Sequence, residues 1–169
     1  MAFDSKALRA RRRIVRPGSR GRPRRASTDT LAVGVILDTS VLIAAERRTF
    51  RFEALLDSLG DEPVAISVIT ASELLHGCHR ALDPGTRARR SAFVEAILDA
   101  IPVLSFGLAD ARRHAELWAE LLKIGAMIGP HDLLIGATAL ARGHDLVTLN
   151  QRDFRRVAGL RLIPIDDYA

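Results

Sequence analysis

Short apolar runs alternate with segments of helical periodicity along residues 31–169, and this alternation constrains the fold more than any other feature. Strands buried on both faces of a parallel sheet appear in sequence as continuous apolar runs. The runs lie at 33–37, 64–67, 103–106, 145–149 and 160–165. Strands that alternate with helices predict a parallel sheet covered by helices on both faces. We therefore predict a single α/β domain over residues 31–169.

The helices between these runs are marked by their ends. Pro84 is typical of a first helical position, and a glycine such as Gly125 or Gly143 is typical of the residue after a helix. Thr39 or Ser40 can cap the helix that follows the first strand. The predicted helices span 40–47, 52–59, 70–80, 84–100, 108–124 and 132–142.

The basic charge of the chain belongs to its first 30 residues. The chain carries a formal net charge of +5, but residues 1–30 hold ten Lys or Arg against two acids, and residues 31–169 are slightly acidic. Nine of these arginines lie within residues 9–25, a segment with almost nothing to bury, so residues 1–30 are predicted to be a disordered tail. Three interpretations stay open: a solvated extension, a nucleic-acid tether and a targeting signal.

Several classes of protein are disfavoured. Cys78 is the only cysteine, which excludes a disulfide scaffold and a cysteine zinc site. The apolar stretch 31–45 is too short to span a bilayer and contains Asp38. We therefore expect a soluble, cytoplasmic protein with no membrane partner. Dinucleotide and P-loop motifs are also absent from the sequence.

Acidic side chains follow the predicted strands. Asp38 ends the first strand, Glu73 follows the second, and Asp132 opens the last helix, whereas Asn150 and Asp153 follow the fourth strand. Active groups of parallel α/β domains lie at the carboxyl ends of the strands. Converging carboxylates take up protons or a cation, and oxygen ligands without Cys or paired His favour Mg²⁺ or Mn²⁺. Such a site serves phosphate chemistry.

Four motifs in order resemble a PIN domain, and most closely the VapC toxins of bacterial toxin–antitoxin pairs. They are LDTSVLIA at 37–44, SELLHG at 72–77, HDLLIGATAL at 131–140 and LVTLNQRDF at 146–154. The resemblance covers about 33–166. It implies a metal-dependent endoribonuclease that acts on RNA, usually as a homodimer, and that a cognate VapB-type antitoxin neutralises.

The resemblance also implies roles for individual residues. Asp38 and Asp132 would be the main metal ligands, and Glu73 would complete the set directly or through water. Either Asn150 or Asp153 supplies the fourth position, and an asparagine there puts a second metal in doubt. The hydroxyls of Thr39, Ser40 and Thr148 would support the site. Three arginines after the fourth strand would hold the RNA backbone: Arg152, Arg155 and Arg156.

Structural alternatives accompany these roles. Asp38 could merely cap a helix, Asp110 is expected to be a first-turn helix charge, and His131 is expected to face solvent. Trp118 is assigned to the core or to a dimer surface. The rival function is a non-catalytic nucleic-acid-binding protein that acts through residues 1–30.

Overall fold

The structure, a computed structural model, describes residues 34–168, so the predicted disordered tail at 1–30 lies outside the described residues. Four parallel strands form one sheet in the order β3-β2-β1-β4. The strands are β1 Val35–Leu37, β2 Val64–Ser67, β3 Val103–Leu104 and β4 Asp145–Val147. The predicted α/β class with a parallel sheet is confirmed.

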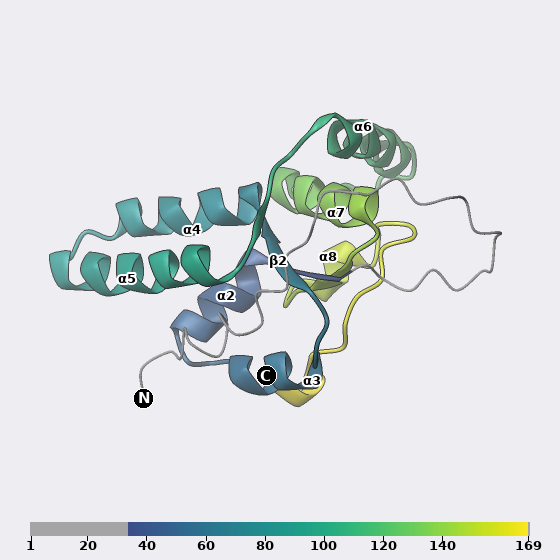
Figure 1. Cartoon of the computed structure of the whole chain (residues 1–169). Coiled ribbons are helices and arrows are strands. Elements are labelled where there is room, and N and C mark those ends of the chain that lie inside the picture. The colour runs from purple at the N-terminus through teal and green to yellow at the C-terminus, as the bar shows by residue number, and fades with distance from the viewer. Residues whose placement is uncertain (1–33, 169) are drawn as a thin grey trace.

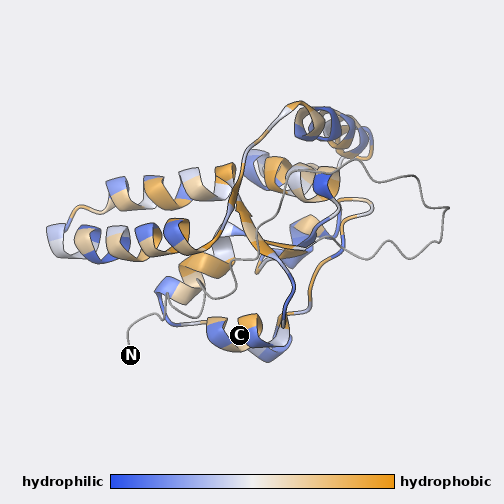
Figure 2. Cartoon of the chain, viewed as in Figure 1, coloured by the Kyte–Doolittle hydropathy of each residue, from blue (hydrophilic) through white to orange (hydrophobic). Residues whose placement is uncertain are grey.

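Helices cover both faces of this sheet (Figure 1). Neighbouring strand residues point to opposite faces, so Leu37 packs into one buried cluster and Ile36 into another. Residues of four helices join Leu37: α2 (Thr39–Glu46), α3 (Phe52–Ser58), α4 (Val68–Arg80) and α5 (Pro84–Ala100). Residues of the other three join Ile36: α6 (Leu108–Lys123), α7 (Pro130–Arg142) and α8 (Gln151–Phe154). Figure 2 shows the apolar strands between helices that each carry polar and apolar residues.

The end of the chain differs from the prediction. The strand expected at 160–165 is wrong, because this segment forms only an isolated bridge between Leu146 and Leu162. Pro164 has no N–H to donate, so a ladder cannot continue through it. The chain ends instead in a 3₁₀ turn, η1 Asp166–Tyr168, whose Tyr168 carbonyl accepts from the N–H of Arg51 at 2.8 Å. Helix α8 was not predicted either.

The central pair of strands positions the acidic side chains. Leu37 of β1 pairs with Val147 of β4, and the N–H of Asp38 donates to the Val147 carbonyl at 2.9 Å. The residues that directly follow β1 and β4 therefore meet at the carboxyl edge of the sheet, where parallel α/β domains place their active groups. Within residues 34–168, no helix is long and apolar enough to cross a membrane.

Candidate active site

Asp38 is a buried carboxylate held by two hydroxyl groups. Only 3% of the residue is exposed. Its Oδ2 accepts hydrogen bonds from Ser40 Oγ at 2.6 Å and from Thr148 Oγ1 at 2.8 Å. Asp38 is also the N-cap of α2, which confirms the helix-capping role that the sequence offered as its structural alternative. Its Oδ1 has no hydrogen bond to another described residue, which leaves that oxygen free to bind a cation or a water molecule.

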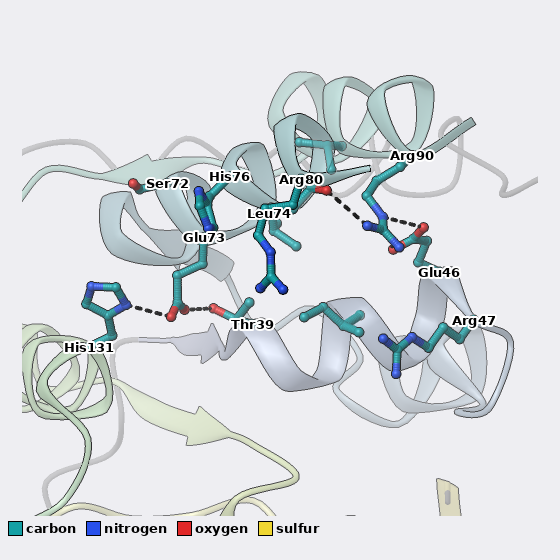
Figure 3. A pocket seen from close by; sticks show the side chains of 13 residues that line it. Thr39, Glu46, Arg47, Ser72, Glu73, Leu74, His76, Arg80, Arg90 and His131 are labelled. Carbon is teal, nitrogen blue, oxygen red and sulfur yellow. Dashed lines mark hydrogen bonds and ion pairs between the residues drawn. The ribbon is translucent and has the colours of Figure 1, made fainter. Parts of the chain in front are cut away.

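Glu73 reaches the same edge from α4, and two residues fix its carboxylate. Thr39 Oγ1 donates to Glu73 Oε2, and His131 Nδ1 lies 2.7 Å from Glu73 Oε1. Figure 3 shows this row of three side chains, which come from α2, α4 and α7. The contact of His131 with Glu73 was missed by the sequence analysis, since 58 residues separate the two and no local pattern shows it. His131 nevertheless stays exposed, with 59% of its side chain accessible to solvent.

Asp132 and Asp153 share one amide donor. Asn150 Nδ2 donates to Asp132 Oδ2 at 2.9 Å and lies 3.0 Å from Asp153 Oδ2. The N–H of Asn150 in turn donates to Thr148 Oγ1 at 2.9 Å, the hydroxyl that also binds Asp38. Asn150 therefore acts here as a donor that bridges two carboxylates, and Asp153 supplies the fourth acidic group beside it.

The charges of the other three acids act on the pKa of Asp132. The pKa of Asp132 is raised from 3.8 to about 6. Burial is the largest cause, and the charge of Asp38 is the second. The hydrogen bond from Asn150 opposes the increase, whereas the charges of Glu73 and Asp153 add to it. Carboxylates that come together repel, and this repulsion is relieved by a proton or by a cation.

The donor set suits a hard divalent cation. Carboxylate oxygens are the ligands that Mg²⁺ and Mn²⁺ prefer, and four carboxylates reach this edge from three helices and one loop. Within residues 34–168, no three His, Cys, Asp or Glu side chains form a ready-made metal cluster. Asp38, Glu73, Asp132 and Asp153 each form a hydrogen bond or contact with a hydroxyl, imidazole or amide group instead.

Every residue predicted for the site lies at this edge of the sheet. Their assignment as metal ligands or supporting residues stays a prediction. The RNA contact predicted for Arg152, Arg155 and Arg156 also stays a prediction, and two of these arginines contact protein groups in the structure. Arg155 donates to Gln151 Oε1 at 2.9 Å, and Arg156 donates to the Met127 carbonyl at 3.1 Å and pairs with Asp153 at 3.8 Å.

The sequence and fold match a known family. Residues 35–160 of the chain match the model of the PIN-domain family. The chain belongs to the PIN-domain family. This PIN domain is 35% identical over 133 residues to "Ribonuclease VapC1" of Rickettsia felis, an alignment that covers 79% of the chain and 97% of that relative. It is 36% identical over 104 residues to "tRNA(fMet)-specific endonuclease VapC" of Shigella flexneri, covering 62% of the chain and 76% of that relative.

Solved structures show the same relationship. The PIN domain superimposes on a chain of the DNA-bound VapBC complex of Salmonella typhimurium with a TM-score of 0.71 and 29% identity. The match covers 78% of this chain and 97% of that chain. A chain of the VapBC2 complex of Rickettsia felis, bound to promoter DNA, gives a TM-score of 0.71 at 27% identity, with 76% and 96% covered. The resemblance to VapC proteins predicted from the four motifs is confirmed.

Proposed function

We propose that this PIN domain is a metal-dependent endoribonuclease and the toxin of a VapBC-type toxin–antitoxin pair. The observation that carries the proposal is the convergence of four carboxylates, which together with burial raises the pKa of Asp132 to about 6. A domain gains no stability from gathering like charges, so such a cluster points to a cation and to catalysis. Its relatives include proteins named ribonucleases and a tRNA endonuclease.

The metal is proposed to be Mg²⁺ or Mn²⁺. Asp38 and Asp132 would be its main ligands, with Glu73 and Asp153 completing the set. When bound, such an ion activates water for attack on a phosphodiester and stabilises the oxygen that leaves. Because Asp132 must lose its proton to bind a cation, binding of the metal and of the proton compete near pH 6.

The remaining polar residues hold the carboxylates in place. Ser40 Oγ and Thr148 Oγ1 donate to one oxygen of Asp38 and leave the other oxygen available. Thr39 fixes Glu73, and Asn150 fixes Asp132 and sets its distance from Asp153. Hydrogen bonds of this kind orient ligating groups before a cation arrives, and their loss typically costs about 10–100-fold in metal affinity or activity.

A VapB-type antitoxin is the proposed protein partner. The similar chains from Salmonella typhimurium and Rickettsia felis were solved as VapBC complexes, and their folds match this one over nearly their whole length. We propose that an antitoxin of the same type binds this chain. Co-expression with the product of a neighbouring small reading frame, followed by co-purification, tests this.

A homodimer is proposed to form through α6. Its exposed face carries apolar residues spaced alternately three and four residues apart, the spacing of a helix–helix seam. Leu108, Trp118 and Leu122 on this face are 68%, 52% and 64% exposed. Ala111 and Ala115 complete the row. A second copy of α6 would bury this row, which is consistent with the dimer surface considered for Trp118.

Cleavage of RNA by the purified chain tests the enzymatic proposal. With Mg²⁺ or Mn²⁺ we expect cleavage of transfer, ribosomal or messenger RNA, and loss of at least about 100-fold in rate for Asp38→Asn or Asp132→Asn, since a metal ligand is removed. Asp61→Asn, an exposed change away from the site, is the matched control and should cleave normally. Unchanged cleavage in EDTA would contradict the metal dependence.

The rival function is a non-catalytic nucleic-acid-binding protein acting through residues 1–30, which lie outside the described residues. It makes opposite predictions. Asp132→Asn would leave function intact, and deletion of residues 1–30 would abolish it. The enzymatic proposal predicts that Asp132→Asn abolishes cleavage and that the deletion leaves cleavage in place.

A further inference from the structure

A pocket of about 780 Å³ opens beside the acidic site, between α2 and α4. Thr39, Glu73 and His131, which form the hydrogen-bonded row of the site, also line this pocket. From there the pocket extends toward the C-terminal ends of α2 and α4, where Glu46, Arg47 and Arg90 lie (Figure 3). A polymer whose cleaved bond lies at the carboxylates can therefore continue into the pocket.

The far end of the pocket is cationic. Three arginines line it, at positions 47, 80 and 90, together with Glu46. Arg90 is already engaged, because its guanidinium pairs with Glu46 at 3.0 Å and donates to the Gly77 carbonyl at 2.9 Å. Arg47 and Arg80 are exposed, and their guanidinium groups have no hydrogen bond or ion pair to any other residue within 34–168. Two positive charges are thus available at this end.

The two available arginines lie two helical turns or slightly more from the hydrogen-bonded pair Glu73 and Thr39. Arg80 follows Glu73 by seven residues on α4, which is two helical turns, so both lie on the same face about 10 Å apart along the axis. Figure 3 shows the Arg80 side chain directed from α4 across the pocket toward α2. Arg47 ends α2 eight residues after Thr39, a rise of about 12 Å. This span corresponds to roughly three nucleotides of a stacked strand.

We propose that the pocket between α2 and α4 binds the RNA strand on one side of the cleaved bond, with Arg47 and Arg80 contacting its phosphates. The inference rests on the proposed ribonuclease function. It adds a direction for the RNA, which runs from the carboxylates along the pocket toward the C-terminal ends of α2 and α4. Arginine suits this task because its planar guanidinium matches a phosphate with two parallel hydrogen bonds. It is separate from the expectation that Arg152, Arg155 and Arg156 hold the backbone, which stays a prediction; of these three, Arg155 and Arg156 already bind protein groups.

Equilibrium binding separates this inference from the enzymatic proposal. The probe is a fluorescein-labelled, mixed-sequence single-stranded RNA oligonucleotide, and the protein is the full chain carrying Asp132→Asn so that it does not cut. Adding Arg80→Gln or Arg47→Gln should each raise Kd about three- to tenfold. Between about 50 and 200 mM salt, the double variant should lower the slope of log Kd against log salt by about 1.4, because each lost phosphate contact contributes about 0.7.

The matched control is Arg112→Gln, which removes an exposed arginine from α6 on the other face of the sheet. The Arg112→Gln substitution should leave the Kd for RNA unchanged. Arg80→Lys should restore part of the affinity, since the charge returns without the planar group. In the cleaving chain, Arg80→Gln should raise KM and leave kcat unchanged.

Three results would overturn the inference. In the first, Arg47→Gln and Arg80→Gln leave the Kd and its salt slope unchanged while the parent chain cuts RNA, so the enzymatic proposal stands and the pocket is not used. In the second, the variants lower the melting temperature and leave the slope unchanged, which makes the arginines structural. In the third, they weaken antitoxin binding alone, which assigns the pocket to that protein. Failure of the parent chain to cut RNA at all would instead contradict the proposed function.

Discussion

Asp132→Asn is expected to make the folded protein more stable while it removes activity. Burial and the neighbouring charges raise the pKa of Asp132 from 3.8 to about 6. A carboxyl group whose pKa is higher in the folded state than in the unfolded state is ionised at a cost to folding. Asparagine has nearly the same shape, can still accept from Asn150, and carries no charge. The substitution should therefore relieve this cost.

The pH dependence of the effect follows from the two pKa values. Below about pH 3 the carboxyl group is protonated in both states, so its ionisation contributes no difference in stability between the variant and the parent. As the pH rises toward 6, the unfolded chain ionises first and the parent loses stability relative to the variant. Above about pH 7, where the folded chain is also ionised, the difference reaches its plateau.

The magnitude follows from the same values. One pKa unit corresponds to about 1.4 kcal/mol, which gives a ceiling of about 3 kcal/mol. Asp132 is only partly buried, so solvent screening reduces the expected gain to about 1–1.5 kcal/mol. Urea unfolding in EDTA at about pH 3 and about pH 7.5 measures it. Asp61→Asn is the control. Equal or lower stability of Asp132→Asn at the higher pH would contradict the raised pKa of Asp132 in the folded chain.

Four further outcomes are expected. Thr148→Val should cost about 1–3 kcal/mol of stability in urea unfolding and slow cleavage, because it removes a buried donor to the first acid of the site; Thr138→Val, which loses only a bond within α7, should cleave normally. Asn150→Asp should destabilise the chain in EDTA, since it replaces a bridging donor by another charge, and should raise the number of Mg²⁺ ions bound in calorimetry. Trp118→Glu should convert a dimer to a monomer in light scattering, and a dimer that survives would place the interface elsewhere. Deletion of residues 1–30 should weaken RNA binding at low salt and leave the cleavage rate at saturating RNA unchanged.

Most of the fold could be predicted because apolar runs mark its strands, and prolines and glycines mark the ends of its helices. The helix Pro84–Ala100 and the strand Val64–Ser67 were predicted at the bounds that the structure shows. Pro84 begins that helix, with Asp83 as its N-cap. The strand predicted at 160–165 failed because apolar content alone does not show where Pro164 interrupts pairing.

The sequence predicted which side chains lie together at the edge of the sheet, but not the hydrogen bonds between them. Asp38, Glu73 and Asp132 could be placed at one edge because the topology of a parallel sheet brings the ends of its strands together. The contact of His131 with Glu73 joins α7 to α4, and no local pattern encodes it. Asp110 shows the same limit. It is a first-turn helix charge as predicted, but it is also 2% exposed and paired with Arg142 at 3.1 Å, a partner 32 residues away.

The dependence of cleavage on the divalent cation tests the central claim most directly. One preparation of the full chain is assayed on RNA with Mg²⁺, then after removal of the metal with EDTA, and again after Mg²⁺ is restored. The carboxylate cluster predicts cleavage, loss of cleavage and full recovery in that order, with Asp132→Asn inactive throughout. Cleavage that continues in EDTA, or that persists in Asp132→Asn, would contradict the account.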